Sequence, residues 1–220
     1  MGQTVVVAID GPGASGKSTL ARRLAARFGL ALLDTGALYR ATAARVLDAG
    51  ADPADPAAAE NAARRLEPAM LSDPRLNDEA IAAASGVVAA IPGVRAALLA
   101  FQRSFAANPP DRARGAMLVG RDIGSVVCPA ADVKLFLTAA AETRARRRAE
   151  ELRGRGAAAI YEHVLQDLNQ RDTRDSNRRV APLTAAPDAV IIDTTGLDAD
   201  QVFGQAAALV AHALEEKEWL

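Results

Sequence analysis

Five short stretches of the chain are hydrophobic at nearly every position. They cover residues 4–10, 31–34, 116–120, 133–137 and 189–193. Short continuous runs of this kind indicate strands that are buried on both faces, and the first run, "TVVVAID", is also rich in β-branched residues. Helical segments separate these runs, and a final helix is expected from Asp200 to about Lys217. The alternation predicts an α/β fold, a three-layer sandwich in which helices cover both faces of a five-stranded parallel sheet.

Two stretches depart from this alternation. The first, from about residue 40 to 111, is rich in alanine and helical in pattern, with breaks at "DPADP", "SDPRLND", "IPGV" and "NPPD". The second, from about residue 142 to 180, is rich in arginine. We therefore expect a single domain over residues 1–220, with a core of 1–40, 112–141 and 181–220, a helical insertion of 41–111 and an arginine-rich region of 142–180.

A glycine-rich loop follows the first predicted strand. The stretch "GPGASGKST" fits G-x-x-x-x-G-K-[ST], with Gly11, Gly16, Lys17 and Ser18 at the fixed positions. A strand before it and the helical stretch "STLARRLAARF" after it supply the context of a P-loop. Glycine lets successive backbone N–H groups point at one anion, and the helix N-terminus adds partial positive charge. The loop predicts a site for a nucleoside triphosphate with Mg²⁺.

Each part of this loop has an expected role. Lys17 is expected to reach the β- and γ-phosphates, and the Ser18 hydroxyl to bind Mg²⁺. The predicted phosphate-binding set is Gly11, Pro12, Gly13, Ala14, Ser15, Gly16, Lys17, Ser18 and Thr19.

Composition argues against several other classes of protein. The 26 Lys and Arg nearly balance 27 Asp and Glu, so the chain has no overall basic charge for nucleic acid or anionic lipid. One cysteine excludes an internal disulfide, and the two histidines are too scattered for a metal cluster. No hydrophobic run approaches the roughly 20 residues of a membrane span. We expect a cytoplasmic monomer that binds neither nucleic acid nor membranes.

The arginines fall into two groups. Arg171, Arg174 and Arg178 recur at i, i+3 and i+7, which places them on one helical face. Such a face suits a phosphoryl group, whose transition-state charge arginine forks can stabilise, and the alternative is a set of surface salt bridges. For Arg146, Arg147, Arg148 and Arg153 we expect a solvated face paired with glutamates.

Five stretches together resemble the bacterial cytidylate kinases, a branch of the nucleoside monophosphate (NMP) kinases. They are "AIDGPGASGKST", "LLDTGALYRA", "PGVRAALLAFQR", "GRDIGSVVCPAADVKLFL" and "RDTRDSNRRVAPL". The resemblance covers the chain nearly end to end. It implies the transfer of a phosphoryl group from ATP to CMP or dCMP, an NMP-binding role for the insertion and a mobile arginine lid for the arginine-rich region.

The resemblance also implies roles for individual residues. Thr35 and Arg40 would hold the CMP phosphate, and Arg95 and Asp122 would face the cytosine. Arg121 would reach phosphate, Arg171 and Asp175 would meet the sugar and phosphate, and Arg174 and Arg178 would clamp phosphoryl groups. The implied catalytic set is Lys17, Arg121, Arg171, Arg174 and Arg178. Asp34, at the end of the second strand, is a candidate for the water shell of the metal or for capping the turn that follows it.

The sequence departs from the family pattern at one position that is expected to contact the base. The family usually has serine six residues before the proline of "PGVR", where this chain has Gly86 beside Ser85. Either a local bulge brings Ser85 into place or the base loses that contact. A carboxylate at Asp122 would accept from the cytosine amine and would face an acceptor oxygen in uracil. Asp122 also follows a strand, as a Mg²⁺-binding aspartate of a P-loop protein does.

Two other functions share the loop. One is a kinase for another small acceptor, such as UMP, AMP, shikimate or dephospho-coenzyme A. The other is a nucleotide-regulated switch with no acceptor, which would not require the arginine-rich region or the large insertion.

Overall fold

The computed structural model describes residues 4–177 and 182–218. The chain forms two compact units, one of Met1–Leu32 with Ala106–Leu220 and one of Leu33–Phe105. The first unit contains most of the sheet together with the helices of the N-terminal and C-terminal parts of the chain. The second unit is helical, except that it includes the end of one strand.

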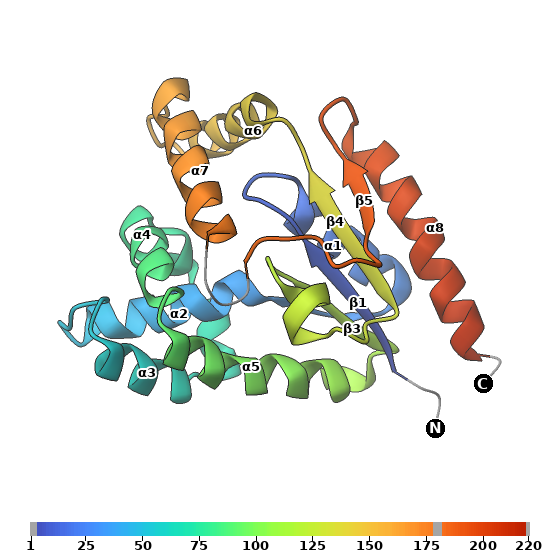
Figure 1. The fold of residues 1–220 in the computed structure, drawn as a ribbon, viewed down its shortest axis with the longest axis horizontal. Helices are drawn as coiled ribbons and strands as arrows, with labels where there is room; N and C mark the ends of the chain where they lie inside the picture. Colours follow the sequence, from blue (N-terminus) through green and yellow to red (C-terminus); the bar gives the residue numbers. More distant parts are fainter. Residues whose placement is uncertain (1–3, 178–181, 219–220) are drawn as a thin grey trace. The chain divides into compact units, whose positions relative to one another are not determined.

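The first unit is built on the predicted sheet. Its strands are β1 (Val5–Asp10), β2 (Ala31–Asp34), β3 (Gly115–Val119), β4 (Val133–Thr138) and β5 (Val190–Asp193). They lie in the order β2-β3-β1-β4-β5 (Figure 1), and β1 with β3, β1 with β4 and β4 with β5 pair in parallel. The prediction of a five-stranded parallel α/β sheet is confirmed, with each boundary within one residue of the expected one.

Strand β1 is the centre of this sheet. It pairs with β3 on one side, where Val7 lies opposite Met117, and with β4 on the other, where Val7 lies opposite Val133. The chain moves from β1 to one side of the sheet and later to the other. Ligands of parallel sheets bind beyond the carboxyl ends of the strands at such a reversal. The loop that follows β1 therefore starts at the most favourable point of the sheet.

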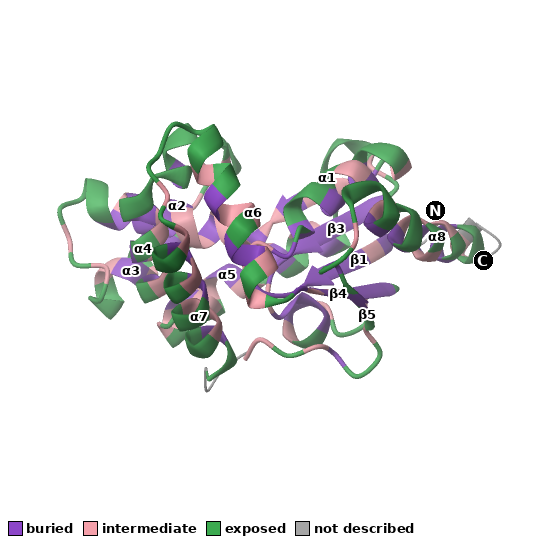
Figure 2. Ribbon diagram, turned by 90° about the horizontal axis from the view of Figure 1, so that it is seen from above, coloured by how far each residue is buried: buried purple, intermediate pink, exposed green. Residues whose placement is uncertain are grey.

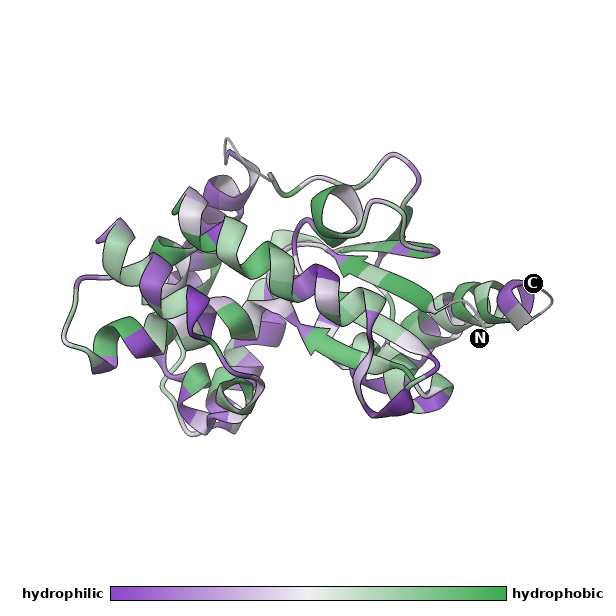
Figure 3. Cartoon of the chain, turned by 90° about the horizontal axis from the view of Figure 1, so that it is seen from below, coloured by the Kyte–Doolittle hydropathy of each residue, from purple (hydrophilic) through white to green (hydrophobic). Residues whose placement is uncertain are grey.

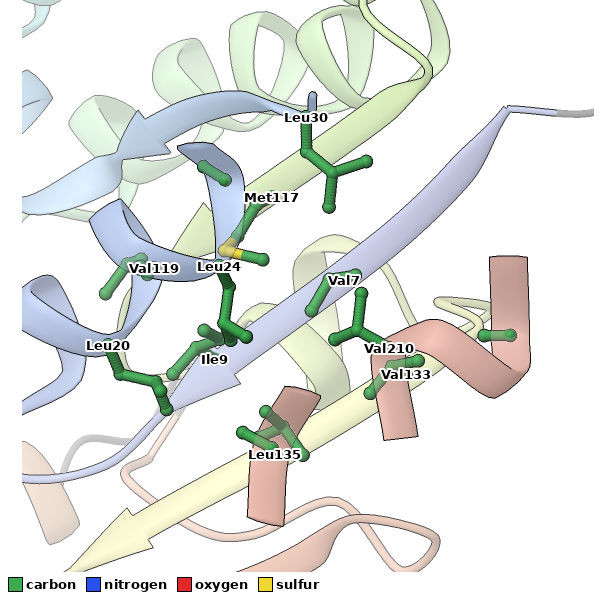
Figure 4. Packing of buried hydrophobic residues seen from close by; sticks show 14 of the residues in the cluster. Val7, Ile9, Leu20, Leu24, Leu30, Met117, Val119, Val133, Leu135 and Val210 are labelled. Atoms are coloured by element: carbon green, nitrogen blue, oxygen red, sulfur yellow. The ribbon is translucent and has the colours of Figure 1, made fainter. Parts of the chain in front are cut away.

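Two helices cover one face of the sheet. Hydrophobic side chains of α1 (Lys17–Phe28) and α8 (Ala199–Glu218) pack on alternate residues of the strands (Figure 4). Figure 2 shows β1, β3 and β4 buried along most of their length, and in Figure 3 the strands are hydrophobic while α8 alternates in character. Ala8 and Leu118, on the opposite face of the strands, are also fully buried. Strands β1, β3 and β4 are continuous hydrophobic runs because both of their faces are covered. For β5 the prediction of a strand buried on both faces is wrong, since Val190 and Ile191 are 44% and 62% exposed at the edge of the sheet.

The arginine-rich region forms two helices. These are α6 (Ala141–Gly154) and α7 (Tyr161–Ser176). They pack against each other through Ala145 and Ala149 on α6 and Val164 and Leu168 on α7, a cluster separate from the core under the sheet.

The second unit is a group of helices. They are α2 (Thr35–Asp48), α3 (Pro56–Arg64), α4 (Glu79–Val88) and α5 (Pro92–Ala107), with short 3₁₀ turns at Pro68–Ser72 and Pro74–Asn77. Helix α2 packs on both α3 and α4. The breaks that the sequence predicted mark helix starts, since Pro56, Pro74 and Pro92 are each the first residue of a helical segment. Proline fits that position because its fixed φ suits a helix and its missing N–H would have no partner there.

Among the described residues, no single helix is long and apolar enough to span a membrane. One pair, Glu79–Val88 with Pro92–Arg112, passes that test together by length and composition and is bent by 100°. Core helices of soluble proteins pass the same test.

Leu24 provides a test of the core under α1. Its side chain is fully buried among the residues of Figure 4, so Leu24→Ala should lower the free energy of unfolding by about 2–5 kcal/mol, measured by urea denaturation. Ile191→Ala is the control, because Ile191 on the edge strand β5 is 62% exposed. Equal losses in the two variants would contradict this description of the core.

Candidate active site

The glycine-rich loop turns back on itself between β1 and α1. Gly11 has φ +141°, and a Cβ there would lie 2.0 Å from the carbonyl oxygen of Leu137 on β4. Gly16 has φ +93° in the left-handed region and immediately precedes α1, and a Cβ there would point into space that the described residues leave open. Ala14 also has a positive φ, of 57°. The loop therefore depends on close approach at Gly11 and on a left-handed backbone at Gly16.

Two polar side chains stabilise the loop from within. The Ser15 hydroxyl donates to the carbonyl oxygen of Pro12 at 3.0 Å, and Lys17 Nζ donates to the same oxygen at 2.5 Å. Lys17 is 6% exposed, so its ammonium is held beside the loop. Ser18 and Thr19, in the first turn of α1, are exposed. The Ser18 hydroxyl is thus available to a ligand at the helix N-terminus.

A buried carboxylate that the sequence analysis did not single out lies directly before this loop. Asp10 Oδ1 accepts the backbone N–H of Ile123 at 2.8 Å, and Oδ2 accepts that of Gly124 at 2.7 Å. These two residues begin a short π-helical turn, Ile123–Val127, immediately after Arg121 and Asp122. Asp10 therefore fixes the segment after β3 to the end of β1.

Burial raises the pKa of Asp10 to about 6. The two backbone hydrogen bonds oppose this effect, the nearby charge of Asp122 adds to it, and Lys17 opposes it. The two N–H hydrogen bonds stabilise the charged carboxylate, but they do not fully offset the cost of its desolvation.

Arg121 and Asp175, two predicted substrate-binding residues, form an ion pair. Arg121 Nε lies 3.0 Å from Asp175 Oδ2, which joins the end of β3 to α7. Burial lowers the pKa of Arg171, and the charges of Arg121 and Arg148 add to this effect while Asp175 opposes it. The structure thus brings Arg121, Arg171 and Asp175 together in the first unit. Arg174 is on the same helix and is exposed, and Arg178 lies outside the described residues.

The second unit holds the other predicted substrate residues. Asp34 caps α2 by accepting the N–H of Gly36 at 2.9 Å, as one of its two expected roles requires, and it also pairs with Arg40 at 3.3 Å. Thr35 is 4% exposed in the first turn of α2. The Arg95 guanidinium lies over the ring of Tyr39, 5.8 Å from its centroid. Asp34, Thr35 and Arg40 are therefore grouped at the start of α2.

The structure of α4 tests the two explanations for the missing serine at Gly86. Ser85 and Gly86 both lie inside a continuous α-helix, and the Ser85 hydroxyl donates to the Ala82 carbonyl at 2.7 Å. No bulge rotates Ser85 into the position of Gly86, so the explanation by a local bulge is wrong for this structure.

The arginines of α6 only partly match the expectation of a solvated face. Arg148 pairs with Glu151 at 2.8 Å, as expected. Arg147 instead donates to the hydroxyl and carbonyl oxygens of Thr194, at 2.8 and 2.6 Å, because the pairing of β4 with β5 brings the loop after β5 next to α6. Arg144, which the sequence analysis did not single out, is 6% exposed. The four arginines in "RARRR" give no sequence signal for which of them faces inward.

Comparison with known proteins identifies the family. The sequence model of the family described as cytidylate kinase matches residues 7–212. The chain belongs to the cytidylate kinase family. It is 56% identical to the cytidylate kinase of Paramagnetospirillum magneticum over 207 residues, covering 94% of this chain and 98% of that one. It is 53% identical to that of Rhodospirillum rubrum over 208 residues, with the same coverage. The predicted resemblance is confirmed, and the chain is a nucleoside monophosphate kinase.

Solved structures agree on the fold alone. An uncharacterized protein from Eubacterium ventriosum superposes with a TM-score of 0.56 at 13% identity, covering 94% of this chain and 99% of that one. A sugar kinase from Janibacter sp. superposes with a TM-score of 0.50 at 15% identity, covering 94% and 95%.

The residues at the loop fit a Mg²⁺ ion that is held together with a nucleotide. Mg²⁺ prefers oxygen ligands and keeps several waters, so one or two protein oxygens with substrate phosphates suffice. Ser18 supplies an exposed hydroxyl at the loop. The described residues contain no group of three or more His, Cys, Asp or Glu side chains that could hold a metal, so the hydroxyl would act with the nucleotide.

The raised pKa of Asp10 predicts a pH dependence of stability. The folded carboxyl binds its proton more tightly than the unfolded one, whose pKa is near 3.8. Its favourable contribution is therefore complete below pH 3.8 and is lost as the pH rises through about 6. Between those limits the loss reaches about 3 kcal/mol.

Asp10→Asn is neutral at every pH and lacks this dependence. From pH 4 to pH 7 its free energy of unfolding, measured in urea, should improve relative to the parent protein. A difference between the two proteins that stays constant over this range would contradict the raised pKa.

Proposed function

We propose that this chain transfers the γ-phosphoryl group of ATP to CMP or dCMP, giving ADP and CDP or dCDP, by in-line transfer with Mg²⁺. The family match over nearly the whole chain supports the reaction. One observation carries the mechanism: the phosphate loop, Arg121, Arg171 and Asp175 lie in one compact unit, with Arg121 paired to the helix that carries Arg171.

The donor nucleotide would bind at the loop Gly11–Thr19. Backbone N–H groups of the loop and the N-terminus of α1 favour the phosphates, and Lys17 would move from the Pro12 carbonyl to the β- and γ-phosphates. When bound through Ser18, Mg²⁺ would neutralise charge on these phosphates. The buried position of Lys17 places its charge where solvent screens it little.

We propose separate residues for the phosphate and for the base of the acceptor. Thr35 and Arg40 would hold the CMP phosphate, near Asp34, which orients Arg40 by their ion pair. Arg40 Nε is buried without a hydrogen-bond partner among the described residues, and an anion at this guanidinium would offset the cost of that donor. Arg95 and Asp122 would face the cytosine.

The arginines would supply the stabilisation of charge during transfer. Arg121, Arg171, Arg174 and Arg178 would surround the moving phosphoryl group, with Asp175 holding Arg121. Burial first, and then the charges of Arg121 and Arg148, lower the pKa of Arg171, and a bound phosphate would stabilise such a partly buried cluster of like charges. No general base is needed, because the attacking oxygen of the CMP phosphate is already an anion. Closure of the lid over the site would exclude water.

We extend the proposal to the organisation of the enzyme. Residues 41–111 would form the NMP-binding insertion and residues 142–180 the lid, within a single kinase domain. The enzyme would be a monomer in the cytoplasm. The near-neutral charge balance supports the absence of binding to nucleic acid or anionic membranes.

A panel of acceptors tests the proposed function. Steady-state release of ADP is measured with ATP, Mg²⁺ and, separately, CMP, dCMP, UMP, AMP, GMP and shikimate. We expect kcat/KM for CMP or dCMP to exceed that for UMP by about tenfold or more, because a site that hydrogen-bonds the cytosine amine rejects a base that lacks it. Equal values for UMP would identify a broader pyrimidine kinase, and no stimulation by any acceptor would contradict the kinase function.

Asp122→Asn tests the assignment of the base contact. Loss of a hydrogen bond to a charged group should lower kcat/KM for CMP by about 10- to 100-fold and that for UMP much less, so that discrimination falls. Asp200→Asn is the control, because Asp200 is 87% exposed on α8. An equal loss of kcat for both acceptors would instead place Asp122 at the metal.

A further inference from the structure

Arg144 connects three parts of the first unit through one buried side chain. Its Nε donates to the Ala139 carbonyl at the end of β4, at 2.9 Å. Its Nη1 lies 2.6 Å from Asp172 Oδ2 on α7 and 3.4 Å from the carbonyl oxygen of Gly13 in the phosphate loop. The Arg144 and Asp172 side chains are 7% and 21% exposed. The guanidinium thus contacts the sheet, the loop and the arginine-bearing helix at once.

The loop also lies against the hydrophobic cluster between α6 and α7, since Ala14 packs on that cluster and Gly13 lies close to Leu168. A Cβ at Gly13 would lie 3.3 Å from Leu168 Cδ2 and 3.9 Å from Arg121 Nη2. Leu168 is 5% exposed and belongs to the cluster between α6 and α7. The loop therefore contacts α7 directly, beside the ion pair.

Two ion pairs attach α7 to the rest of the unit, and both start from the same face of the helix. Asp172 pairs with Arg144 and, one turn later, Asp175 pairs with Arg121. Residues three apart lie on the same side of a helix, so both carboxylates are on the side of α7 that faces the core. Arg171 and Arg174 immediately precede these anchors. The rotation of α7, and with it the direction of these arginines, is set by the two pairs.

The pair of Arg144 and Asp172 is only half formed. Asp172 Oδ1 is buried without a hydrogen-bond partner among the described residues, so a single N–O contact links the two side chains. A buried ion pair with an unsatisfied oxygen adds little net stability, because desolvation offsets its attraction. Its directionality remains, because the hydrogen bond fixes where the Asp172 carboxylate lies relative to the guanidinium.

We propose that Arg144 and Asp172 are positioning residues that keep the arginines of α7 aligned with the phosphate loop during phosphoryl transfer. They act through α7 and touch neither nucleotide. This inference rests on the proposed function. When the pair is broken, the loop still binds ATP, but the arginines no longer meet the transferring group in register. Transfer to CMP then slows, while water gains access to the γ-phosphate.

The test compares Asp172→Asn and Arg144→Lys with the parent enzyme. We expect kcat for transfer to CMP to fall about tenfold or more, since small misplacements of catalytic groups have large effects on rate. KM for ATP should change less than about threefold, and ATP hydrolysis without acceptor should stay constant or rise. The double variant should be no slower than the slower single one, because both substitutions break one interaction.

A matched control is available in the same unit. Arg23 and Asp200 also lie 2.6 Å apart, but Asp200 is 87% exposed, so Asp200→Asn removes an ion pair of equal length from the surface. It should change neither transfer nor hydrolysis. Circular dichroism and thermal unfolding of every variant report whether the fold is kept.

The outcomes separate this inference from the proposed function. If the parent enzyme shows no release of ADP stimulated by CMP, the proposed function fails, and this inference fails with it. If the parent enzyme is active but transfer and hydrolysis fall in the same proportion, if the two substitutions add, or if both single variants fail to fold, the pair has a structural role only and this inference alone is overturned.

Discussion

The carboxylate of Asp10 is the interaction on which the site depends. It ends the central strand β1, and it accepts two backbone N–H groups from the segment after β3. The loop that follows Asp10 and the two residues that precede Ile123, Arg121 and Asp122, are thereby fixed to each other through one carboxylate and two main-chain N–H groups. Because β1 and β3 pair in parallel, their carboxyl ends lie side by side. The hydrogen bonds of the buried carboxylate then fix the positions of the two segments that follow these strands.

The arginine-bearing helix α7 is attached to this frame by side chains rather than by the sheet. Asp175 contacts Arg121 at the end of β3, and Asp172 contacts Arg144 beside the loop. The α6–α7 cluster is small and separate from the main core. An element with few buried hydrophobic contacts opens more readily than a strand of the core, as the proposed lid would require.

The sequence predicted the parts whose cause is local. Continuous hydrophobic runs located the strands, the loop motif located the turn after β1, and prolines marked the helix starts of the second unit. The partners of Asp10 are backbone groups 113 and 114 residues away, which leave no pattern in side chains. Arg144 and Arg147 turn inward, whereas Arg146 beside them stays exposed, and only the packing of α7 and of the loop after β5 decides between them.

The two fixed glycines of the phosphate loop are required for different reasons. At Gly11 any side chain would collide with the main chain of β4, so the constraint is one of volume. At Gly16 there is room for a methyl group, but the backbone is left-handed, so the constraint is one of chirality. Glycine is therefore required at the two positions of the motif for independent reasons. The first is the close approach of a neighbouring strand, and the second is the backbone conformation with which the chain turns to begin α1.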